Sequence, residues 1–414
     1  MANKPKIRFK GFDDAWEQRK LGEVAEFSKG SGYSKGDLVE YGTPIILYGR
    51  LYTNYETRIS DVDTFVEAKV GSVYSKGGEV VVPASGETAE DIARAATVDK
   101  SGILLGGDLN IVMPNKDINS SFLAISISSG NPQRELAKKA QGKSVVHIHN
   151  EEIKNLVLPF PIKDEQNKIA SYFCQLDNLI TLHQRKCDQM NELKKYMLTK
   201  MFPQNGSKVP EIRFDGYTDD WEQRKLSELA SMHARIGWQN LRTSEFLDVG
   251  DYMLITGTDF EDGKVNYSTC HYVEKERYDQ DKNIQIKNGS ILITKDGTLG
   301  KVAYVEGLSM PATLNAGVFN VEIKNKNETD GRYLFQFLKA PFLMDYVAQK
   351  ATGGTIKHLN QNILVDFPIS SPSKEEQTKI GEYFSSIDHL ITLHQSKCEN
   401  LKNLKKYMLR NMFV

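Results

Sequence analysis

The feature that most constrains the fold of this chain is a long segment that occurs twice. Residues 165–202 and 376–413 share 23 identities in 38 positions at a constant offset of 211. Two unrelated helices would not share so many identical positions, so one structural unit is used twice. A shorter repeat precedes each copy, because residues 5–22 return as residues 210–227 at an offset of 205. The chain therefore runs through a lead-in, a globular part and a long segment, and then through the same three again.

Each long segment carries the apolar stripe of a coiled coil. Apolar and small side chains recur at intervals of four and three residues along residues 169–190, and an equivalent stripe runs along residues 380–401. Such a stripe must be buried against another helix, and the other copy is the obvious partner. The residues predicted to form the seam between the helices are Ile169, Phe173, Ile180, His183, Cys187, Ile380, Phe384, Ile391, His394 and Cys398.

The start and the length of these helices can also be predicted. Ser373 and Glu376 form a capping-box pattern, which places the start of the second helix at this point. A helix of about 38 residues with a rise of 1.5 Å per residue is roughly 57 Å long. The paired segments are thus expected to form a rigid rod.

The two globular parts, residues 24–158 and 229–367, are predicted to be mixed α/β domains. Short apolar runs bounded by glycine-rich turns are typical of strands. The predicted strands are residues 43–48, 79–83, 289–294 and 318–323, and the predicted short helices are residues 121–129 and 133–139. Outside the repeats the two parts share little sequence detail, so we expect one fold with two different surfaces.

Length and composition describe a soluble chain of several domains. At 414 residues the chain is too long for one core, and its 40% apolar and 26% charged residues suit globular domains. No run of about 18 apolar residues is present and residues 1–20 are polar, so we expect a cytoplasmic protein. Four scattered cysteines fit a reducing compartment. The net charge of −1 means that any nucleic-acid partner would have to meet a locally basic face.

Enzymatic motifs occur only as fragments. Gly142-Lys143-Ser144 is like the end of a phosphate-binding loop, but Ala137 stands where that motif requires glycine. Residues 131–134, Asn-Pro-Gln-Arg, match half of an adenine-methyltransferase tetrapeptide and lack its second proline and its aromatic residue. No metalloprotease helix or Gly-x-Ser-x-Gly elbow is convincing. We therefore predict a chain without catalytic residues.

The polar members of the predicted seam allow two interpretations. His183 with Cys187, and His394 with Cys398, each stand four residues apart on one helix face, and four such side chains can ligate zinc. Alternatively, these small and polar residues set the register of the helix pair, as buried polar groups do in coiled coils. We favour register and predict no metal site.

Several loops combine glycine with basic, hydroxyl or aromatic residues at matching points of the two halves. His147 and His358 are 211 positions apart, and Tyr33 and Trp238 are 205 apart. Loops of this kind at a domain edge suit phosphate contact, although solvated turns and structural histidines are the alternative for each one. The candidate binding residues are Lys29, Tyr33, Arg50, Lys143, Ser144, His147, Arg235, Trp238, Gln239, Lys295, Thr298, Asn315, Thr355, Lys357 and His358.

With these features the chain resembles the specificity subunit of type I restriction-modification systems. The resemblance rests on the lead-in stretches 16–21 and 221–226, on the doubled long segments, and on residues 289–302 and 312–315. It covers essentially the whole chain. The first globular part matches less well, because Pro-Ala-Ser-Gly-Glu-Thr at residues 83–88 replaces the Thr-Lys-Asp-Gly-Thr stretch of the second part.

The resemblance implies an α+β fold with two target recognition domains separated by two long antiparallel helices. The implied boundaries are a lead-in at 1–22, the first recognition domain at 23–160, the central helix at 161–204, the second lead-in at 205–227, the second recognition domain at 228–371, and the C-terminal helix at 372–414. Each domain is expected to read one half of a split, asymmetric DNA site. We assign Arg235, Gln239, Lys295 and Asn315 to one half-site, and Lys29, Tyr33 and Arg50 to the other.

The resemblance also implies partners. Members of this family are non-catalytic and dock two methyltransferase (modification) subunits, which use S-adenosylmethionine, and restriction subunits, which use ATP and Mg²⁺; no cofactor is expected in this chain. The outer face of the rod is the candidate docking surface, with Lys186, Lys194, Lys195, Lys397, Lys405 and Lys406. Two alternatives remain open: a stand-alone DNA-binding repressor or architectural protein, and a scaffold whose paired domains bind a glycan or a peptide.

Overall fold

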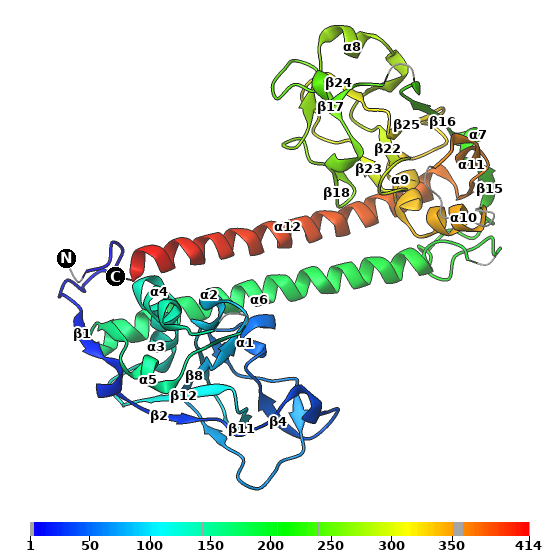
Figure 1. Cartoon of the computed structure of the whole chain (residues 1–414). Coiled ribbons are helices and arrows are strands. Elements are labelled where there is room, and N and C mark those ends of the chain that lie inside the picture. The colour runs from blue at the N-terminus through cyan, green and yellow to red at the C-terminus, as the bar shows by residue number, and fades with distance from the viewer. Residues whose placement is uncertain (1–3, 143–144, 205, 238–239, 351–358, 414) are drawn as a thin grey trace. The chain divides into compact units, whose positions relative to one another are not determined.

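A computed structural model describes residues 4–142, 145–204, 206–237, 240–350 and 359–413 (Figure 1). The chain divides into two compact units, of which the first comprises Met1–Lys186 and His394–Val414 and the second comprises Cys187–Leu393. Each unit therefore holds one globular domain together with part of each long helix. The predicted boundaries separated the helices from the domains, whereas the compact units cut through both helices.

The globular domain of the first unit contains two sheets. One sheet has the strand order β2-β12-β8-β10-β5 and the other has the order β3-β6-β4-β11-β7. The strands of the first sheet are β2 (Ala25–Lys29), β12 (Leu109–Pro114), β8 (Glu79–Pro83), β10 (Ala96–Val98) and β5 (Arg58–Ile59). Those of the second sheet are β3 (Leu38–Val39), β6 (Phe65–Val66), β4 (Thr43–Ile46), β11 (Ser101–Leu105) and β7 (Tyr74–Lys76).

The globular domain of the second unit also contains two sheets, with six and four strands instead of five and five. Its sheets are β16-β25-β22-β23-β19-β18 and β20-β17-β24-β21. The first comprises β16 (Ala230–Ala234), β25 (Val318–Ile323), β22 (Ile291–Thr294), β23 (Val302–Tyr304), β19 (Lys264–Val265) and β18 (Phe260–Glu261). The second comprises β20 (His271–Tyr272), β17 (Met253–Ile255), β24 (Ala312–Leu314) and β21 (Gln285–Ile286). The expectation of one fold used twice is confirmed.

A buried apolar strand lies inside one sheet of each domain. Every residue of β8 is buried, and so is every residue of β22. A strand buried on both faces needs a continuous apolar run, which the three valines of β8 and the Ile-Leu-Ile of β22 provide. Of the four apolar runs that were predicted as strands, those at 79–83 and 318–323 coincide with β8 and β25, and those at 43–48 and 289–294 overlap β4 and β22.

Short helices cover these sheets and connect their strands. In the first unit α3 (Ser120–Ile127) and α4 (Gly130–Lys139) correspond to the two predicted helices, and the side chain of Asn119 caps α3 by accepting from the Phe122 backbone nitrogen at 3.0 Å. The other short elements of this unit are η1 (Leu21–Glu23), η2 (Lys35–Asp37), α1 (Arg50–Thr53), α2 (Ala89–Ile92) and α5 (Asn150–Lys154). Those of the second unit are α7 (Leu226–Leu229), η4 (Thr243–Glu245), η5 (Gly257–Asp259), α8 (Lys275–Asp279), η6 (Lys282–Ile284), α9 (Gly331–Lys339), α10 (Phe342–Lys350) and α11 (Gln361–Val365).

The two long segments are continuous helices, α6 (Lys163–Lys200) and α12 (Lys374–Met412) (Figure 1). In the first unit Asp177 of α6 pairs with Lys405 of α12, and the earlier His183 lies against the later His394. In the second unit Lys194 pairs with Asp388. Residues later in one helix thus meet residues earlier in the other, so the predicted antiparallel pairing is confirmed.

The capping prediction for α12 is half correct. Ser373 Oγ accepts a hydrogen bond of 3.3 Å from the Glu376 backbone nitrogen, as an N-terminal cap requires. The Glu376 carboxylate does not return to Ser373, because both of its oxygens accept from Arg213 of the second lead-in. Pairing with a guanidinium outweighs a second hydrogen bond to a neutral backbone amide.

Each lead-in fastens its domain to a long helix. In the first unit β1 (Glu17–Lys20) pairs with β14 (Val157–Phe160), directly before α6. The preceding Trp16 is buried, and its ring centroid lies 5.9 Å from that of Phe122 and 6.2 Å from that of Phe413. In the second unit β15 (Glu222–Lys225) pairs with β26 (Pro368–Ser371), and Trp221 packs on Phe202. Phe413 follows the end of α12 and packs in the core of the first unit. Phe202 follows the end of α6 and packs in the core of the second unit.

None of the helices in the described part of the chain is long and apolar enough to cross a membrane.

Candidate nucleic-acid interface

Three predicted binding residues of the second unit lie on loops at one edge of its sheets. Lys295 directly follows β22 and its backbone nitrogen donates to the Gly317 carbonyl at 2.9 Å. Asn315 directly follows β24 and its backbone nitrogen donates to the Ile255 carbonyl at 2.9 Å. Thr298 is exposed on the loop after Lys295, and the Thr294 hydroxyl donates to its carbonyl. The structure therefore brings Lys295, Thr298 and Asn315 to the same edge.

The side chains at this edge are suited to contact a ligand. Lys295 is half-buried, and its Nζ lies 5.6 Å from the centroid of the Phe319 ring, so its stem rests on the sheet. The Asn315 Oδ1 accepts from the Ala316 backbone nitrogen at 2.8 Å, which fixes the orientation of its amide. A positioned amide and an anchored ammonium are the groups that read base edges or hold phosphates.

Arg235 belongs to the same edge but is buried. It is only 1% exposed, and it donates to the Leu314 carbonyl at 2.9 Å, the Gln280 Oε1 at 3.2 Å and the Thr313 hydroxyl at 3.3 Å. Burial lowers its pKa, and the nearby Arg277 acts in the same direction. The guanidinium thus supports the end of β24, directly before Asn315, instead of pointing to solvent. The sequence pattern could not distinguish this supporting role from direct contact.

In the first unit the predicted residues are distributed over two loops. Lys29 is exposed at the end of β2. The Tyr33 hydroxyl is bonded within the domain, because it lies 2.5 Å from Ser72 Oγ and accepts from the Lys69 backbone nitrogen at 2.7 Å. Arg50 is also committed internally, since its guanidinium pairs with Glu56 and Asp63, each at 2.9 Å. Of these three side chains, Lys29 is the one left exposed for a ligand.

His147 lies on a short two-stranded sheet of the first unit. Its strand β13 (Val146–His147) pairs with β9 (Ser85–Gly86), and His147 Nδ1 lies 3.1 Å from Ser85 Oγ. The ring itself is exposed. This places His147 beside the residues 83–88 that replace the Lys295 loop of the second unit.

The other predicted binding residues lie outside the described part of the chain: Lys143, Ser144, Trp238, Gln239, Thr355, Lys357 and His358.

The predicted seam residues Ile169 and Phe173 belong to the core of the first unit, and Cys187, Ile380, Phe384 and Ile391 belong to that of the second. Most seam residues are buried, while Ile180, His183 and His394 are half-buried. The Nδ1 atoms of His183 and His394 lie 2.9 Å apart, and the thiol of Cys398 donates to the Ile180 carbonyl at 3.9 Å. Among the described residues, no group of three or more His, Cys, Asp and Glu side chains is arranged to hold a metal ion. The histidine pair is thus a hydrogen-bonded contact at the seam.

The lysines predicted for the outer face of the rod fall into two classes. Lys186, Lys195, Lys397 and Lys406 are exposed. Lys194 and Lys405 do not belong to the outer face, which corrects the prediction. Lys194 is 7% exposed and donates to both oxygens of Asp388 at 2.6 and 2.8 Å, and Lys405 pairs with Asp177. Their long stems bring the ammonium groups into the helix interface because a carboxylate lies there.

The sequence contained a signal for these ion pairs that the prediction did not use, because both copies of the helix keep the same charged residues. Asp177 and Asp388 are equivalent residues, and so are Lys194 and Lys405. Both partners of these two ion pairs are therefore kept in the two copies of the helix. The same holds for the arginines of the lead-ins, since Arg8 pairs with Glu165 and Arg213 pairs with Glu376.

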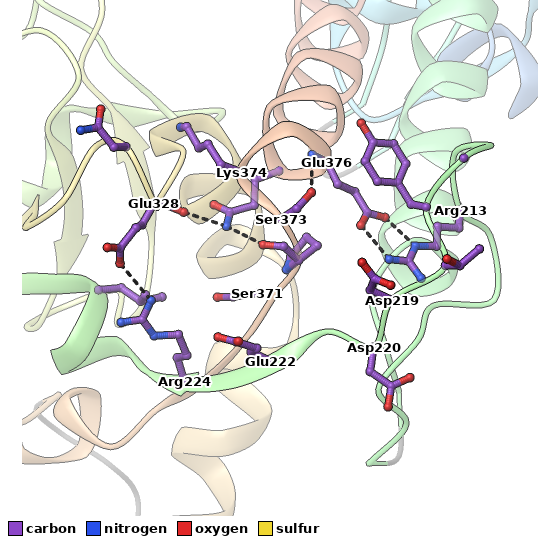
Figure 2. Close-up of a pocket in the computed structure, with 17 residues that line it drawn as sticks. Arg213, Asp219, Asp220, Glu222, Arg224, Glu328, Ser371, Ser373, Lys374 and Glu376 are labelled. Atoms are coloured by element: carbon purple, nitrogen blue, oxygen red, sulfur yellow. Dashed lines mark hydrogen bonds and ion pairs between the residues drawn. The ribbon is translucent and has the colours of Figure 1, made fainter.

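A pocket of about 510 Å³ lies where the second lead-in meets the start of α12 (Figure 2). Arg213 donates two hydrogen bonds to Glu376 at 2.8 and 2.9 Å, and Gln377 donates to the carbonyls of Pro372 and Glu328. Asp219 and Asp220 also line this pocket (Figure 2). Its cations Arg213, Arg224 and Lys374 are all paired with carboxylates, so the pocket anchors the helix and does not suit a phosphate.

Known proteins share both the sequence pattern and the fold. The family described as type I restriction modification DNA specificity domain matches residues 13–192 and again residues 218–403. The type I restriction enzyme MjaVIII specificity subunit of Methanocaldococcus jannaschii is 23% identical over 410 residues, which cover 95% of this chain and 91% of that protein. The MjaIX specificity subunit of the same organism is 26% identical over 201 residues, which cover 47% of this chain and 44% of that protein.

Solved structures show the same fold. The type I restriction-modification S subunit from M. genitalium superposes with a TM-score of 0.67 at 15% identity, over 99% of both chains. A chain from a study of complex assembly and conformational transition of the type I R-M system gives a TM-score of 0.51 at 16% identity, over 96% of this chain and 97% of that one. Because the family matches both halves and most of the sequence, this chain belongs to the type I restriction-modification DNA specificity domain family.

Proposed function

We propose that this chain is the sequence-specific DNA-recognition subunit of a type I restriction-modification complex and that its two domains read the halves of one bipartite, asymmetric site. The observation that carries the proposal is that each unit has two sheets whose corresponding strands follow a similar order, whereas the loops at the edge differ. The second unit presents Lys295-Asp-Gly-Thr298, and residues 83–88 of the first unit read Pro-Ala-Ser-Gly-Glu-Thr. Two equal scaffolds with unlike loops suit two unlike half-sites.

Base contacts are assigned to the side chains that lie at these edges. We assign the base contacts of the second half-site to Lys295, Thr298 and Asn315, because lysine pairs with the acceptors of guanine and asparagine pairs with adenine. In the first half-site we assign Lys29 and His147, which are exposed. Arg235, Arg50 and Tyr33 act by holding the loops, since their polar atoms are bonded within the domains.

The long helices act as a spacer between the readers. DNA rises about 3.4 Å per base pair, and proteins with two reading modules commonly contact half-sites roughly one helical turn apart. A rod held by ion pairs at Asp177 and Asp388 keeps its length, so the gap between the half-sites is constant while its base sequence is free.

The chain has a scaffolding and non-catalytic role in this proposal. The exposed lysines Lys186, Lys195, Lys397 and Lys406 form the docking surface for two methyltransferase subunits, to which restriction subunits add. S-adenosylmethionine, ATP and Mg²⁺ belong to those partner subunits. The study of complex assembly that includes a chain of the same fold is consistent with such a role.

Mapping of methylated adenines tests the proposal. The full chain is co-expressed with a modification subunit in cells without other adenine methylation. One recurrent motif with two defined halves and an unspecified gap is expected. Scattered methylation, or a single continuous motif, would reject the bipartite reading. A gel shift with the isolated chain distinguishes a stand-alone DNA-binding protein, which would bind the same duplex tightly without partners.

A further inference from the structure

A second cleft occurs in the first unit, at a place that the proposed DNA-reading edges do not include. It has a volume of about 550 Å³ and lies between the start of α4 and the last turns of α12. Its size is within the usual range of small-molecule sites. The polar residues that line it include Ser129, Gly130, Arg134, Lys402, Lys406 and Arg410.

The cleft is strongly basic. Five cationic side chains line it, namely Arg134, Lys402, Lys405, Lys406 and Arg410, against the single carboxylate of Asp177. Asp177 is already paired with Lys405. Within the described parts of the chain, Lys402, Lys406 and Arg410 have no carboxylate within ion-pair distance. Positive charge gathered in a concave site attracts an anion.

Backbone groups at the start of α4 favour the same ligand. Only the N–H groups of Gly130 and Asn131 are available at this end, because Pro132 has no N–H and that of Gln133 donates to the Ser129 carbonyl at 3.4 Å. The helix dipole is positive at this end. Gly130, the first residue of this ten-residue helix, has φ 62°, a backbone conformation that glycine adopts without strain. Helix N-termini of this kind bind phosphate groups.

An unpartnered hydroxyl is the independent observation that points to a ligand. Ser129 precedes the helix, lines the cleft and is 5% exposed. Its Oγ makes no hydrogen bond to any described residue, although a serine at this position commonly caps the helix. Buried hydroxyls without a partner are uncommon in folded proteins. The Oγ is enclosed by protein in its present rotamer, and rotation about the Cα–Cβ bond would present it to a phosphate oxygen in the cleft.

The internal repeat shows that these cations are not needed to build the helix pair. The residues of α6 equivalent to Lys402 and Arg410 are Asn191 and Thr199, whereas the ion-paired Lys405 is kept as Lys194. The helix pair therefore forms equally well without the two cations. Their presence in the first unit alone indicates a role in binding.

We propose that this cleft binds a phosphate group, carried either by a small phosphorylated molecule or by the DNA backbone. The cations bind the phosphate oxygens, the start of α4 and Ser129 donate to them, and Tyr55, Leu409 and Phe413 provide an apolar wall for the rest of the ligand. The inference does not depend on the proposed reading of a bipartite site.

The experiment uses the full chain and two probes. Binding of inorganic phosphate is followed by broadening of its ³¹P resonance, and binding of a duplex without any target site is followed by fluorescence anisotropy. The test variant combines Lys402→Asn with Arg410→Thr, which introduces the residues of the first copy and so preserves the helix. Ser129→Ala is the second variant, because it removes a hydroxyl that has no partner. Lys138→Ala, which removes an exposed lysine of α4 that does not line the cleft, is the control.

The expected result is that the double variant binds phosphate roughly tenfold more weakly, that Ser129→Ala binds it a few-fold more weakly, and that the control is unchanged. A parallel loss of duplex affinity identifies DNA as the source of the phosphate, whether or not free phosphate binds detectably. Unchanged duplex affinity with a loss of free phosphate binding identifies a small molecule. If both variants match the wild-type chain with both probes, the proposal is overturned. None of these outcomes alters the methylation pattern expected from the proposed function.

Discussion

The carboxylate of Asp177 in α6 accepts a hydrogen bond of 2.6 Å from the hydroxyl of Thr57 and forms an ion pair with Lys405 of α12. One side chain therefore joins the first globular domain to both long helices. In the second unit the equivalent Asp388 accepts from Lys194 and, at 2.8 Å, from Gln336 of α9. Each domain is thus connected to the rod by a carboxylate that the repeat preserves.

Replacing Asp177 with alanine should lower the free energy of unfolding of the first unit by about 2 kcal/mol. The substitution leaves the partly buried ammonium of Lys405 and the buried hydroxyl of Thr57 without their partner. Urea unfolding followed by circular dichroism provides the measurement. Gln175→Ala, at an exposed position of the same helix, should stay within about 0.5 kcal/mol of the wild-type chain. Equal stability of both variants would show that Asp177 does not connect the elements.

Arg213→Ala should destabilise the second unit by about 3 kcal/mol, because it leaves the Glu376 carboxylate buried and unpaired. Glu376 is 1% exposed and receives both guanidinium hydrogen bonds. The matched control is Arg224→Ala, since Arg224 is paired at 3.4 Å with the exposed Glu228 and Glu328 and such pairs contribute about 0 to 1 kcal/mol. Thermal melts of the two variants check the difference, and a control that melts as early as Arg213→Ala would contradict it.

The histidine pair predicts a dependence of stability on pH. Burial lowers the pKa of His394, and the nearby His183, Lys186 and Lys397 lower it further. The unfolded chain therefore binds a proton more readily than the folded chain does. Stability should be complete above the ordinary histidine pKa of about 6.5 and should fall as the pH decreases through the lower pKa of the folded state.

Melting temperatures between pH 7.5 and pH 5 measure this effect. His394→Gln should flatten the profile, because glutamine keeps a polar contact at the seam without a titrating group. His389→Gln, which removes an exposed histidine of the same helix, should leave the profile unchanged. A profile that is equally steep in His394→Gln would exclude the histidine pair as its cause.

Arg235→Ala should reduce stability as well as DNA binding. The guanidinium holds the carbonyl of Leu314 and the hydroxyl of Thr313, so its loss leaves two buried acceptors unsatisfied at a cost of about 2 kcal/mol. Arg235→Lys should not restore the loss, because a lysine cannot reproduce a planar fork of donors. Differential scanning fluorimetry checks this, with the exposed Arg242→Ala as control. A stable Arg235→Ala variant that binds DNA weakly would instead assign Arg235 to direct contact.

The repeat made the architecture predictable. An apolar stripe that recurs in two copies requires a helix pair, and α6 and α12 begin two residues before the predicted segments. Strands β8 and β25 could be predicted because a short apolar run is most readily buried as a strand inside a sheet. The family resemblance, which rested on the doubled segments, is confirmed.

The candidate site was harder to predict because exposure is a property of the fold. Arg235 and Lys295 both stand next to glycine-rich turns, but Arg235 points into the domain and Lys295 lies at its edge. Likewise, Lys194 and Lys195 are neighbours in sequence, about 100° apart around the helix, and the position of Asp388 decides that Lys194 is the inward one. A long cationic side chain can point either into the protein or out to solvent. The carboxylate that decides between the two lies far away in the sequence.

The most direct test of the account is adenine-methylation mapping with variants that alter one unit at a time. Complexes carrying Lys295→Ala in the second unit or Lys29→Ala in the first are compared with the wild-type complex in the same cells. Each substitution should weaken the base preference in one half of the methylated motif only. The length of the gap should be the same in all three complexes. If either substitution changed both halves together, or changed the gap, the two domains would not be independent readers held by a rigid spacer.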